Sequence, residues 1–261
     1  NTGFSLYSNI PEPATFMVRN NLIQNSRGNA ILSQRSGGTD PSGVNKMTIQ
    51  DNTISIDGTG LSNGSMIILS TSASVLNAEA IVKRNTLSFT GDYSLWTNSS
   101  PFGIRPSGVF NVITIDSNEV SFTGVNLSPG AGGPNFPGGT AILISSNSGS
   151  STISLPANAV LNINANKISG FKQSVVFFHA MNGQFGGLAN GILANMNNNS
   201  FTGDSISINN GTTSQTINAN CNWYGAAAAQ NVLQKITPTT VNYSPWLING
   251  TDNDPAIGFQ P

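Results

Sequence analysis

A seven-residue pattern of apolar and polar positions recurs along the chain. An apolar residue is followed by two free positions, Asn, one free position, a second apolar residue and usually Ser or Thr, as in Ile49–Ser55. Successive anchor asparagines are 31, 33, 33, 48, 33 and 21 residues apart. A nearly fixed period of this size, carried by short β-type segments, is typical of a solenoid. The anchors are Asn21, Asn52, Asn85, Asn118, Asn166, Asn199 and Asn220.

The pattern predicts two short strands that meet at a corner. Its two apolar residues fall on opposite parities of an extended strand, so the backbone must bend just before the Asn. The two residues ahead of the Asn, such as Gln50-Asp51 and Lys83-Arg84, are mostly polar and are expected outside. A more apolar strand type lies between the patterns, as in Met66–Ser70 and Ala141–Ser145. One period therefore predicts two or three strands, and no helical period competes with them.

Stacking of the coils predicts an internal asparagine ladder. One coil cannot bury its apolar face alone, so neighbouring coils stack about 4.8 Å apart. Each anchor amide would then bond to backbone or to the next amide. One anchor stays open, because Asn197 replaces Asn199 if Ser200–Gly203 aligns with Ser121–Gly124.

The same register predicts that opposite charges face each other on the outside of neighbouring coils. Three such pairs are expected, namely Asp51 with Arg84, Lys83 with Asp116, and Glu119 with Lys167.

Composition narrows the class of protein and its setting. Only 8% of the 261 residues are charged and the net charge is -1, which argues against a nucleic-acid partner. No apolar run reaches transmembrane length, so membrane insertion is not expected. The single Cys221 allows no internal disulfide and is expected to be a buried thiol. The Asn-, Ser- and Thr-rich, Lys-poor composition favours an extracellular or cell-surface location, and a start at Asn1 favours an excised part of a longer chain with flanking domains.

The repeat resembles the right-handed parallel β-helices of the pectate-lyase-like superfold. This resemblance implies an all-β fold, a right-handed parallel β-helix solenoid of about seven coils with a C-terminal cap. We expect coils over residues 1–225 and a cap or tail of the same domain over 226–261. The ending is similar to the block that closes β-helix modules in large secreted or surface proteins of bacteria. That block comprises Asn220–Gly225, Val241–Leu247 and Asp252–Pro255.

The ending also has a physical reading, because a solenoid must cover its last coil. The Ala-rich segment Ala226–Ile236 contains no Pro and predicts a short helix. Four aromatic residues are expected to cover the open end, namely Trp223, Tyr224, Tyr243 and Trp246.

Two loops are candidates for ligand contact. The 48-residue interval exceeds the 33-residue period by the length of Val125–Gly139, which is read either as a functional loop or, preferably, as a tolerated spacer. A second loop contains Asp92–Thr97. Tyr93, Trp96 and Phe136 offer flat faces for sugar rings, and packing of Trp96 onto the coil is an equal alternative.

Catalytic signals are sparse. The superfold hosts polysaccharide lyases, which use a basic side chain, and hydrolases, which use paired carboxylates. The only histidine, His179, ends an apolar strand and is read as structural. Asp252 and Asp254 could help to bind Ca²⁺, but two carboxylates are far short of the six to eight oxygens of such a site. No metal or other cofactor is therefore expected, with Ca²⁺ as the weak alternative. If the chain is a lyase, the residues to inspect are Lys83, Arg84 and Arg105, with Asp51, Asp92 and Asp116.

Two function classes remain. The preferred hypothesis is a non-enzymatic extracellular module of a bacterial surface or adhesin-type protein, with polysaccharide or cell-surface glycan as its partner through edge loops. The alternative is a polysaccharide lyase or glycoside hydrolase of the same superfold. Ice binding is disfavoured, because the outward positions mix charged and polar residues instead of forming a Thr face.

Overall fold

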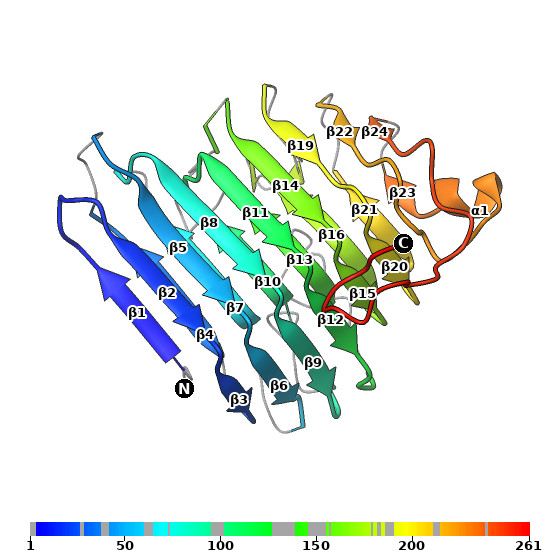
Figure 1. Ribbon diagram of the computed structural model, residues 1–261, viewed down its shortest axis with the longest axis horizontal. Helices are drawn as coiled ribbons and strands as arrows, with labels where there is room; N and C mark the ends of the chain where they lie inside the picture. Colours follow the sequence, from blue (N-terminus) through cyan, green and yellow to red (C-terminus); the bar gives the residue numbers. More distant parts are fainter. Residues whose placement is uncertain are drawn as a thin grey trace.

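The computed structural model is a parallel β-solenoid whose strands form three long sheets (Figure 1). This confirms the all-β solenoid class expected from the repeat. The structure describes residues 4–26, 29–37, 42–59, 65–72, 74–94, 102–126, 139–145, 155–156, 158–178, 180–181, 184–185, 191–210, 215–237 and 240–261.

Successive strands along the chain pass from sheet A to sheet B to sheet C. In the described residues, sheet A holds eight strands: β1 (Phe4–Ser8), β4 (Ile31–Arg35), β7 (Ser65–Thr71), β10 (Phe102–Ser107), β13 (Thr140–Ser145), β16 (Gln173–Phe178), β21 (Ile206–Asn209) and β23 (Ile236–Thr237). Sheet B also holds eight: β2 (Thr15–Arg19), β5 (Asn45–Gln50), β8 (Ala78–Lys83), β11 (Val112–Asp116), β14 (Val160–Asn164), β19 (Leu193–Asn195), β22 (Ile217–Asn218) and β24 (Val241–Asn242).

Sheet C holds six described strands and runs beside sheet B. They are β3 (Leu22–Gln24), β6 (Thr53–Asp57), β9 (Thr86–Thr90), β12 (Glu119–Phe122), β15 (Lys167–Ser169) and β20 (Ser200–Thr202). A separate antiparallel pair is formed by β17 (Ala180–Met181) and β18 (Gln184–Phe185).

Apolar residues one period apart stack in columns that fill the interior. Ile49 pairs in register with Val82, and Val82 with Ile115, and all three are fully buried. Because side chains alternate along a strand, the residue next to each of these buried side chains points outward, as Gln50 and Lys83 do. This part of the core is therefore a row of stacked aliphatic side chains along the solenoid axis.

The corner between sheets B and C is made by one residue with left-handed backbone conformation. Its φ lies between 52° and 57° in every coil, a conformation that most L-residues adopt only at an energetic cost. The residue immediately after it is the ladder asparagine. The corner residues are Asn20, Asp51, Arg84, Ser117, Ala165, Asn198 and Cys221.

The predicted asparagine ladder is present. In the middle of the molecule, the backbone N and the Nδ2 of Asn85 both donate to Oδ1 of Asn118, each at 3.0 Å. Nδ2 of Asn85 also donates to the carbonyls of Lys83 in its own coil and Ile49 in the preceding coil. Each side chain thus ties its own corner to both neighbouring coils. The same bonds recur at Asn52, Asn118, Asn166 and Asn199, and Asn21 begins the ladder.

The expected last anchor, Asn220, is wrong, and Asn222 takes its place. Oδ1 of Asn222 accepts hydrogen bonds from the backbone N and the Nδ2 of Asn199, at 2.8 and 2.9 Å. Ala219 fills the inward position that larger apolar residues occupy in other coils, while Ile217 pairs with Ala194. Because Ala219 is small, the pattern of large apolar residues did not mark this coil. The interval that follows Asn199 is therefore two residues longer than expected.

Asn199, and not Asn197, is the anchor of the preceding coil. Ser200 pairs with Lys167 and Phe201 with Ile168, so the alternative alignment of Ser200–Gly203 with Ser121–Gly124 is also wrong.

The short helix expected within Ala226–Ile236 is α1 (Ala229–Leu233), which buries Val232. Stacking does not stop at residue 225, because β23 extends sheet A and β24 extends sheet B. Tyr224 is fully buried against Phe201, with ring centroids 5.6 Å apart.

A buried ion pair attaches this end to the coils. Oδ1 of Asp204 accepts a hydrogen bond from Nζ of Lys235 at 2.7 Å, and Oδ2 accepts one from Oγ of Ser174 at 2.6 Å. The carboxylate has no exposed surface, so all its stabilising contacts come from these groups.

The last residues fold back along the side of the solenoid, where the red segment crosses β15 and β12 in Figure 1. The backbone N of Phe259 donates to the carbonyl of Ala165 at 2.7 Å, and the Phe259 ring is buried. Gly258, with φ of 110°, lies so close to Ser117 that an added Cβ would stand 2.7 Å from its Cα. Small residues at these two corners give the tail room to approach the backbone.

We predict that the two neighbouring asparagines of the last coil differ sharply in their effect on stability. Asn222→Ala removes the acceptor of the Asn199 backbone N–H and the amide donor of the Met196 carbonyl in the interior, while the Ala219 carbonyl keeps its hydrogen bond from Tyr224. It should lower the free energy of unfolding by roughly 3 kcal/mol. Asn220→Ala is the matched control, because the buried Oδ1 of Asn220 has no hydrogen-bond partner in the described structure. It should cost less than about 1 kcal/mol in urea denaturation, and equal losses would contradict the assigned register.

We predict a second large loss from Asp204→Asn, which keeps the shape but leaves the Lys235 ammonium without its carboxylate. Because Lys235 is partly exposed, the expected loss in free energy of unfolding is about 2–3 kcal/mol, below the full effect for a wholly buried pair. Urea denaturation measures it. Asp254→Asn in the exposed tail is the control and should leave the unfolding midpoint unchanged.

Candidate functional site

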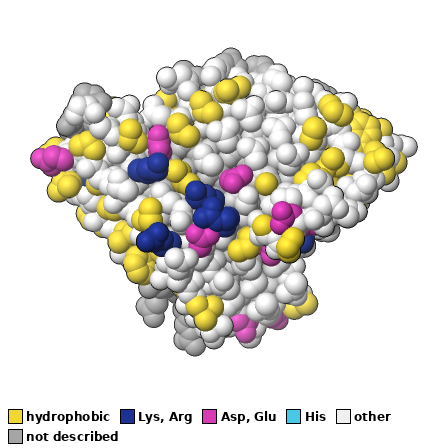
Figure 2. Space-filling model, in the orientation of Figure 1, with side chains coloured by type: hydrophobic (Ala, Val, Ile, Leu, Met, Phe, Trp, Pro, Cys, Tyr) yellow, Lys and Arg dark blue, Asp and Glu magenta, His cyan; other side chains and the backbone are white. Residues whose placement is uncertain are grey.

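Charged side chains gather on the outer face of sheet B and at its corner with sheet C (Figure 2). Those within the strands, such as Lys46, Glu79 and Lys83, occupy outward positions, whereas Asp51 and Arg84 are the corner residues that follow β5 and β8. We call this set the charged corner. It comprises Arg19, Lys46, Asp51, Glu79, Lys83, Arg84 and Asp116.

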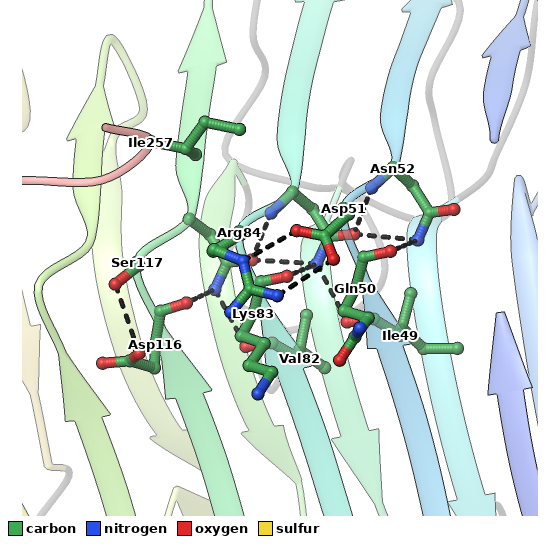
Figure 3. Close-up of polar contacts among 12 residues, drawn as sticks. Ile49, Gln50, Asp51, Asn52, Val82, Lys83, Arg84, Asp116, Ser117 and Ile257 are labelled. Atoms are coloured by element: carbon green, nitrogen blue, oxygen red, sulfur yellow. Dashed lines mark hydrogen bonds and ion pairs between the residues drawn. The ribbon is translucent and has the colours of Figure 1, made fainter. Parts of the chain in front are cut away.

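Asp51 and Arg84 form the most tightly bonded pair of the charged corner, as Figure 3 shows. Nε of Arg84 lies 2.7 Å from Oδ1 of Asp51, and Nη2 lies 2.9 Å from Oδ2. This confirms the first predicted charge pair. The hydrogen bond from Arg84 lowers the pKa of Asp51, and the same bond raises the pKa of Arg84. Both groups therefore stay charged and bound to each other over the physiological pH range.

Lys83 and Asp116 are register partners on β8 and β11, as predicted. No ion pair joins them in the described structure; instead, Oγ of Ser117 donates to Oδ2 of Asp116 at 3.2 Å. The Lys83 side chain extends away from the Asp51–Arg84 pair (Figure 3). The third predicted pair is present, with Nζ of Lys167 3.8 Å from Glu119 and 3.3 Å from Asp252.

The remaining lyase candidates lie elsewhere. Arg105 is on β10 of sheet A, with its guanidinium 5.6 Å from the Phe102 ring centre, and burial lowers its pKa. Asp92 lies in the turn after β9 and accepts hydrogen bonds from Asn126 and from the backbone of Ser94. The structure therefore brings Lys83 and Arg84 together with Asp51 and Asp116, but it places Arg105 and Asp92 outside this group.

The expected sugar-binding role of Tyr93 requires an exposed ring, and the structure buries it completely. Its hydroxyl donates to the carbonyl of Ile56 at 3.3 Å, and its ring lies 5.0 Å from that of Phe122. Burial also raises the pKa of the phenol. Trp96, Phe136 and His179 lie outside the described residues, as does most of the Val125–Gly139 loop.

A feature missed in the sequence is a column of outward asparagines on sheet B, which we call the asparagine lane. Its four members are register partners in successive strands, and Nδ2 of Asn195 lies 3.4 Å from Oδ1 of Asn162. Alignment of the outward positions of these strands, one residue after each inward apolar side chain, would have found it. Side-chain amides offer both donors and acceptors, which suits hydroxyl-rich ligands. The lane consists of Asn162, Asn195, Asn218 and Asn242.

The described residues contain no group of three or more His, Cys, Asp or Glu that could hold a metal ion. Asp252 bonds to Lys167 and to the backbone of Gln260, and Asp254 caps the backbone of Ala256. Within the same residues, no helix is long and apolar enough to cross a membrane.

No family model, curated protein or solved structure matches this sequence.

We predict that the Asp51–Arg84 pair makes stability depend on pH in acid. Because the pKa of folded Asp51 is lowered, the pair stabilises the fold above the unfolded pKa of about 3.9 and loses this effect as pH falls through the folded pKa. Asp51→Asn should cost at most about 1 kcal/mol at pH 7, since both side chains are partly exposed, and less at pH 2.

Asn is a suitable replacement because it tolerates the left-handed conformation of position 51. Urea denaturation at both pH values measures the difference. Asp116→Asn is the control, because the Asp116 carboxylate is bonded to Ser117 and not to an arginine side chain. An equal loss at pH 2 and pH 7 would show that the effect is not electrostatic.

Proposed function

We propose that the chain is a non-enzymatic β-solenoid module of an extracellular or cell-surface, adhesin-type bacterial protein that contacts glycans along its side. The proposal includes the right-handed, pectate-lyase-like form of the β-helix, and the asparagine ladder is its support. In this reading the solenoid is a stiff scaffold, and the binding groups are the asparagine lane and the edge loops.

The observation that carries the proposal is the arrangement of the outer face of sheet B. The asparagine lane presents neutral amides at the spacing of successive strands, and the charged corner lies beside it. Amides are suited to hydrogen bonding with sugar hydroxyls and need no charge on the ligand. The strongest ionic group nearby, Arg84, is already bound at two points by Asp51.

The alternative is a polysaccharide lyase, and one observation favours it. Lys83 stands in register beside Asp116 on a solvent-accessible face, next to Arg84. A lyase needs a basic group that removes a proton next to a carboxylate and a cation that stabilises the resulting charge. The bonding of Arg84 to Asp51 opposes that use, because the guanidinium would have to leave its partner to reach a substrate.

We expect no turnover and measurable binding. Pectins, alginate, glycosaminoglycans and neutral glycans, incubated with the protein with and without Ca²⁺, should yield no new double bonds or reducing ends. A glycan found by affinity electrophoresis should lose affinity about fivefold or more in the double variant Asn162→Ala, Asn195→Ala, if one hydrogen bond per binding event is lost.

The matched control truncates two half-buried polar residues on sheet C, Ser55→Ala and Ser88→Ala, and should bind normally. Circular dichroism melts verify that both double variants fold. Depolymerisation that disappears in Lys83→Gln would replace the proposal by the lyase alternative. Equal affinity of both double variants for the glycan would show that the asparagine lane is not part of the binding site.

A further inference from the structure

The two ends of the solenoid are finished differently. At the C-terminal end the ladder closes on Tyr224, whose hydroxyl accepts a hydrogen bond from Nδ2 of Asn222 and donates to the carbonyl of Ala219 at 2.8 Å. Val232 of α1 is buried there, and Tyr243 and Trp246 pack against the core. Among the described residues, the last ladder amide is therefore bonded at this end, and the core is packed against Tyr243 and Trp246.

At the N-terminal end the core columns stop at β1, β2 and β3, the terminal strands of the three sheets. Phe4 stacks on Ile31 in register, yet Phe4 is 41% exposed whereas Ile31 is fully buried. Phe16 and Ile23 also end inward columns and are only partly buried. In the described structure, the apolar core is therefore partly exposed to solvent at this end.

The ladder is also open at this end. Asn21 uses its backbone N and Nδ2 on Oδ1 of Asn52, and Nδ2 also bonds to the carbonyl of Arg19. In every interior coil, Oδ1 of the ladder asparagine accepts two hydrogen bonds from the coil before it, as Asn118 does from Asn85. No described residue supplies these two donors to Oδ1 of Asn21. Nδ2 of Asn21 also lacks, among the described residues, the carbonyl of a preceding coil to which Nδ2 of Asn85 donates in the interior.

We propose that this end is a stacking interface for one further parallel β-coil that carries an asparagine at the corner position. Such a coil would donate its backbone N and Nδ2 to Asn21, pair with the edges of β2 and β3, and cover Phe16 and Ile23. Charge favours an acidic residue near Arg19, because opposite charges face each other between the coils that follow, as in Lys46–Glu79 and Asp51–Arg84.

A second copy of this chain does not meet these requirements. In the described residues of its C-terminal end, Nδ2 of the last ladder asparagine, Asn222, is already bonded to Met196 and Tyr224, so this end does not offer the amide donor that Asn21 lacks. Two N-terminal ends would meet with antiparallel strands, whereas the ladder bonds pass between parallel coils. The occupant is therefore a coil of another β-solenoid segment. This inference concerns the end of the scaffold and holds whether or not the side of the solenoid binds glycans.

The chain's own repeat supplies the test. Phe4 is in register with Ile31, and Ile31 with Ile67, so Asn1 corresponds to position 64 two coils later. A second copy of residues 45–63 is fused directly before Asn1, which places the copied Asn52 over Asn21 and the copied Asp51 next to Arg19. The control fusion carries Asn52→Ala in the copied segment only.

Amide hydrogen exchange of residues 15–24 is compared in the chain alone and in both fusions. The intact copy should slow exchange at least about tenfold and raise Tm, and the Asn52→Ala copy should lose most of that protection. Equal exchange in the chain alone and the intact fusion would overturn the proposal.

Light scattering of the chain alone provides a second criterion. A monomer whose 15–24 amides exchange rapidly fits an open end. A dimer in which those amides are already protected would assign the interface to a second copy and overturn the proposal.

Discussion

The hydrogen bonds of one buried asparagine per coil hold this structure together. Each coil must turn sharply between sheets B and C, and the residue at the turn adopts a left-handed conformation. The asparagine that follows bonds to a carbonyl two residues earlier, which stabilises the turn, and to the coils on both sides, which fixes their register. Water cannot replace these bonds, because the amides in the middle of the ladder have no exposed surface.

Because the register is fixed, the chemistry of the surface is arranged in columns. A residue's closest partners on the outside are those one period away, as with Asp51 and Arg84, and not its sequence neighbours. The asparagine lane and the charged corner are both products of this rule. Binding surfaces on such a protein are therefore built by repeating one residue type at one position of the coil.

The sequence predicted the interior well because six anchors are each preceded at three residues by a sizeable apolar side chain. The prediction failed at the last coil, where Ala219 fills that place and is too small to mark it. Alternation within a strand would also have placed Arg35 inside, since it shares parity with Ile31 and Ser33 on β4. Its buried guanidinium bonds to Asn45 on the next strand of its own coil and to Ser8 in the neighbouring coil, and no local pattern reveals these contacts.

Turns were harder to predict than strands. Tyr93 follows a strand in a polar segment, and only the fold shows that its ring lies against Gly58, where an added Cβ would stand 2.4 Å from the ring. Likewise, Arg105 is 21 positions after Arg84 in the chain but lies on a different sheet. A period of about 33 residues distributed over three sheets separates residues that a linear reading groups together.

The folded-back tail determines where mechanical force enters the molecule. Phe259 is anchored to Ala165, and Asp252 to Lys167, so the C-terminus lies on the flank of the solenoid and not at its tip (Figure 1). A load applied at Pro261 would reach the coil of β15 first, and α1 and the last coil would be bypassed until the tail had peeled away. The terminal cap therefore carries no load until the tail segment 252–261, which crosses the side of the molecule, has detached.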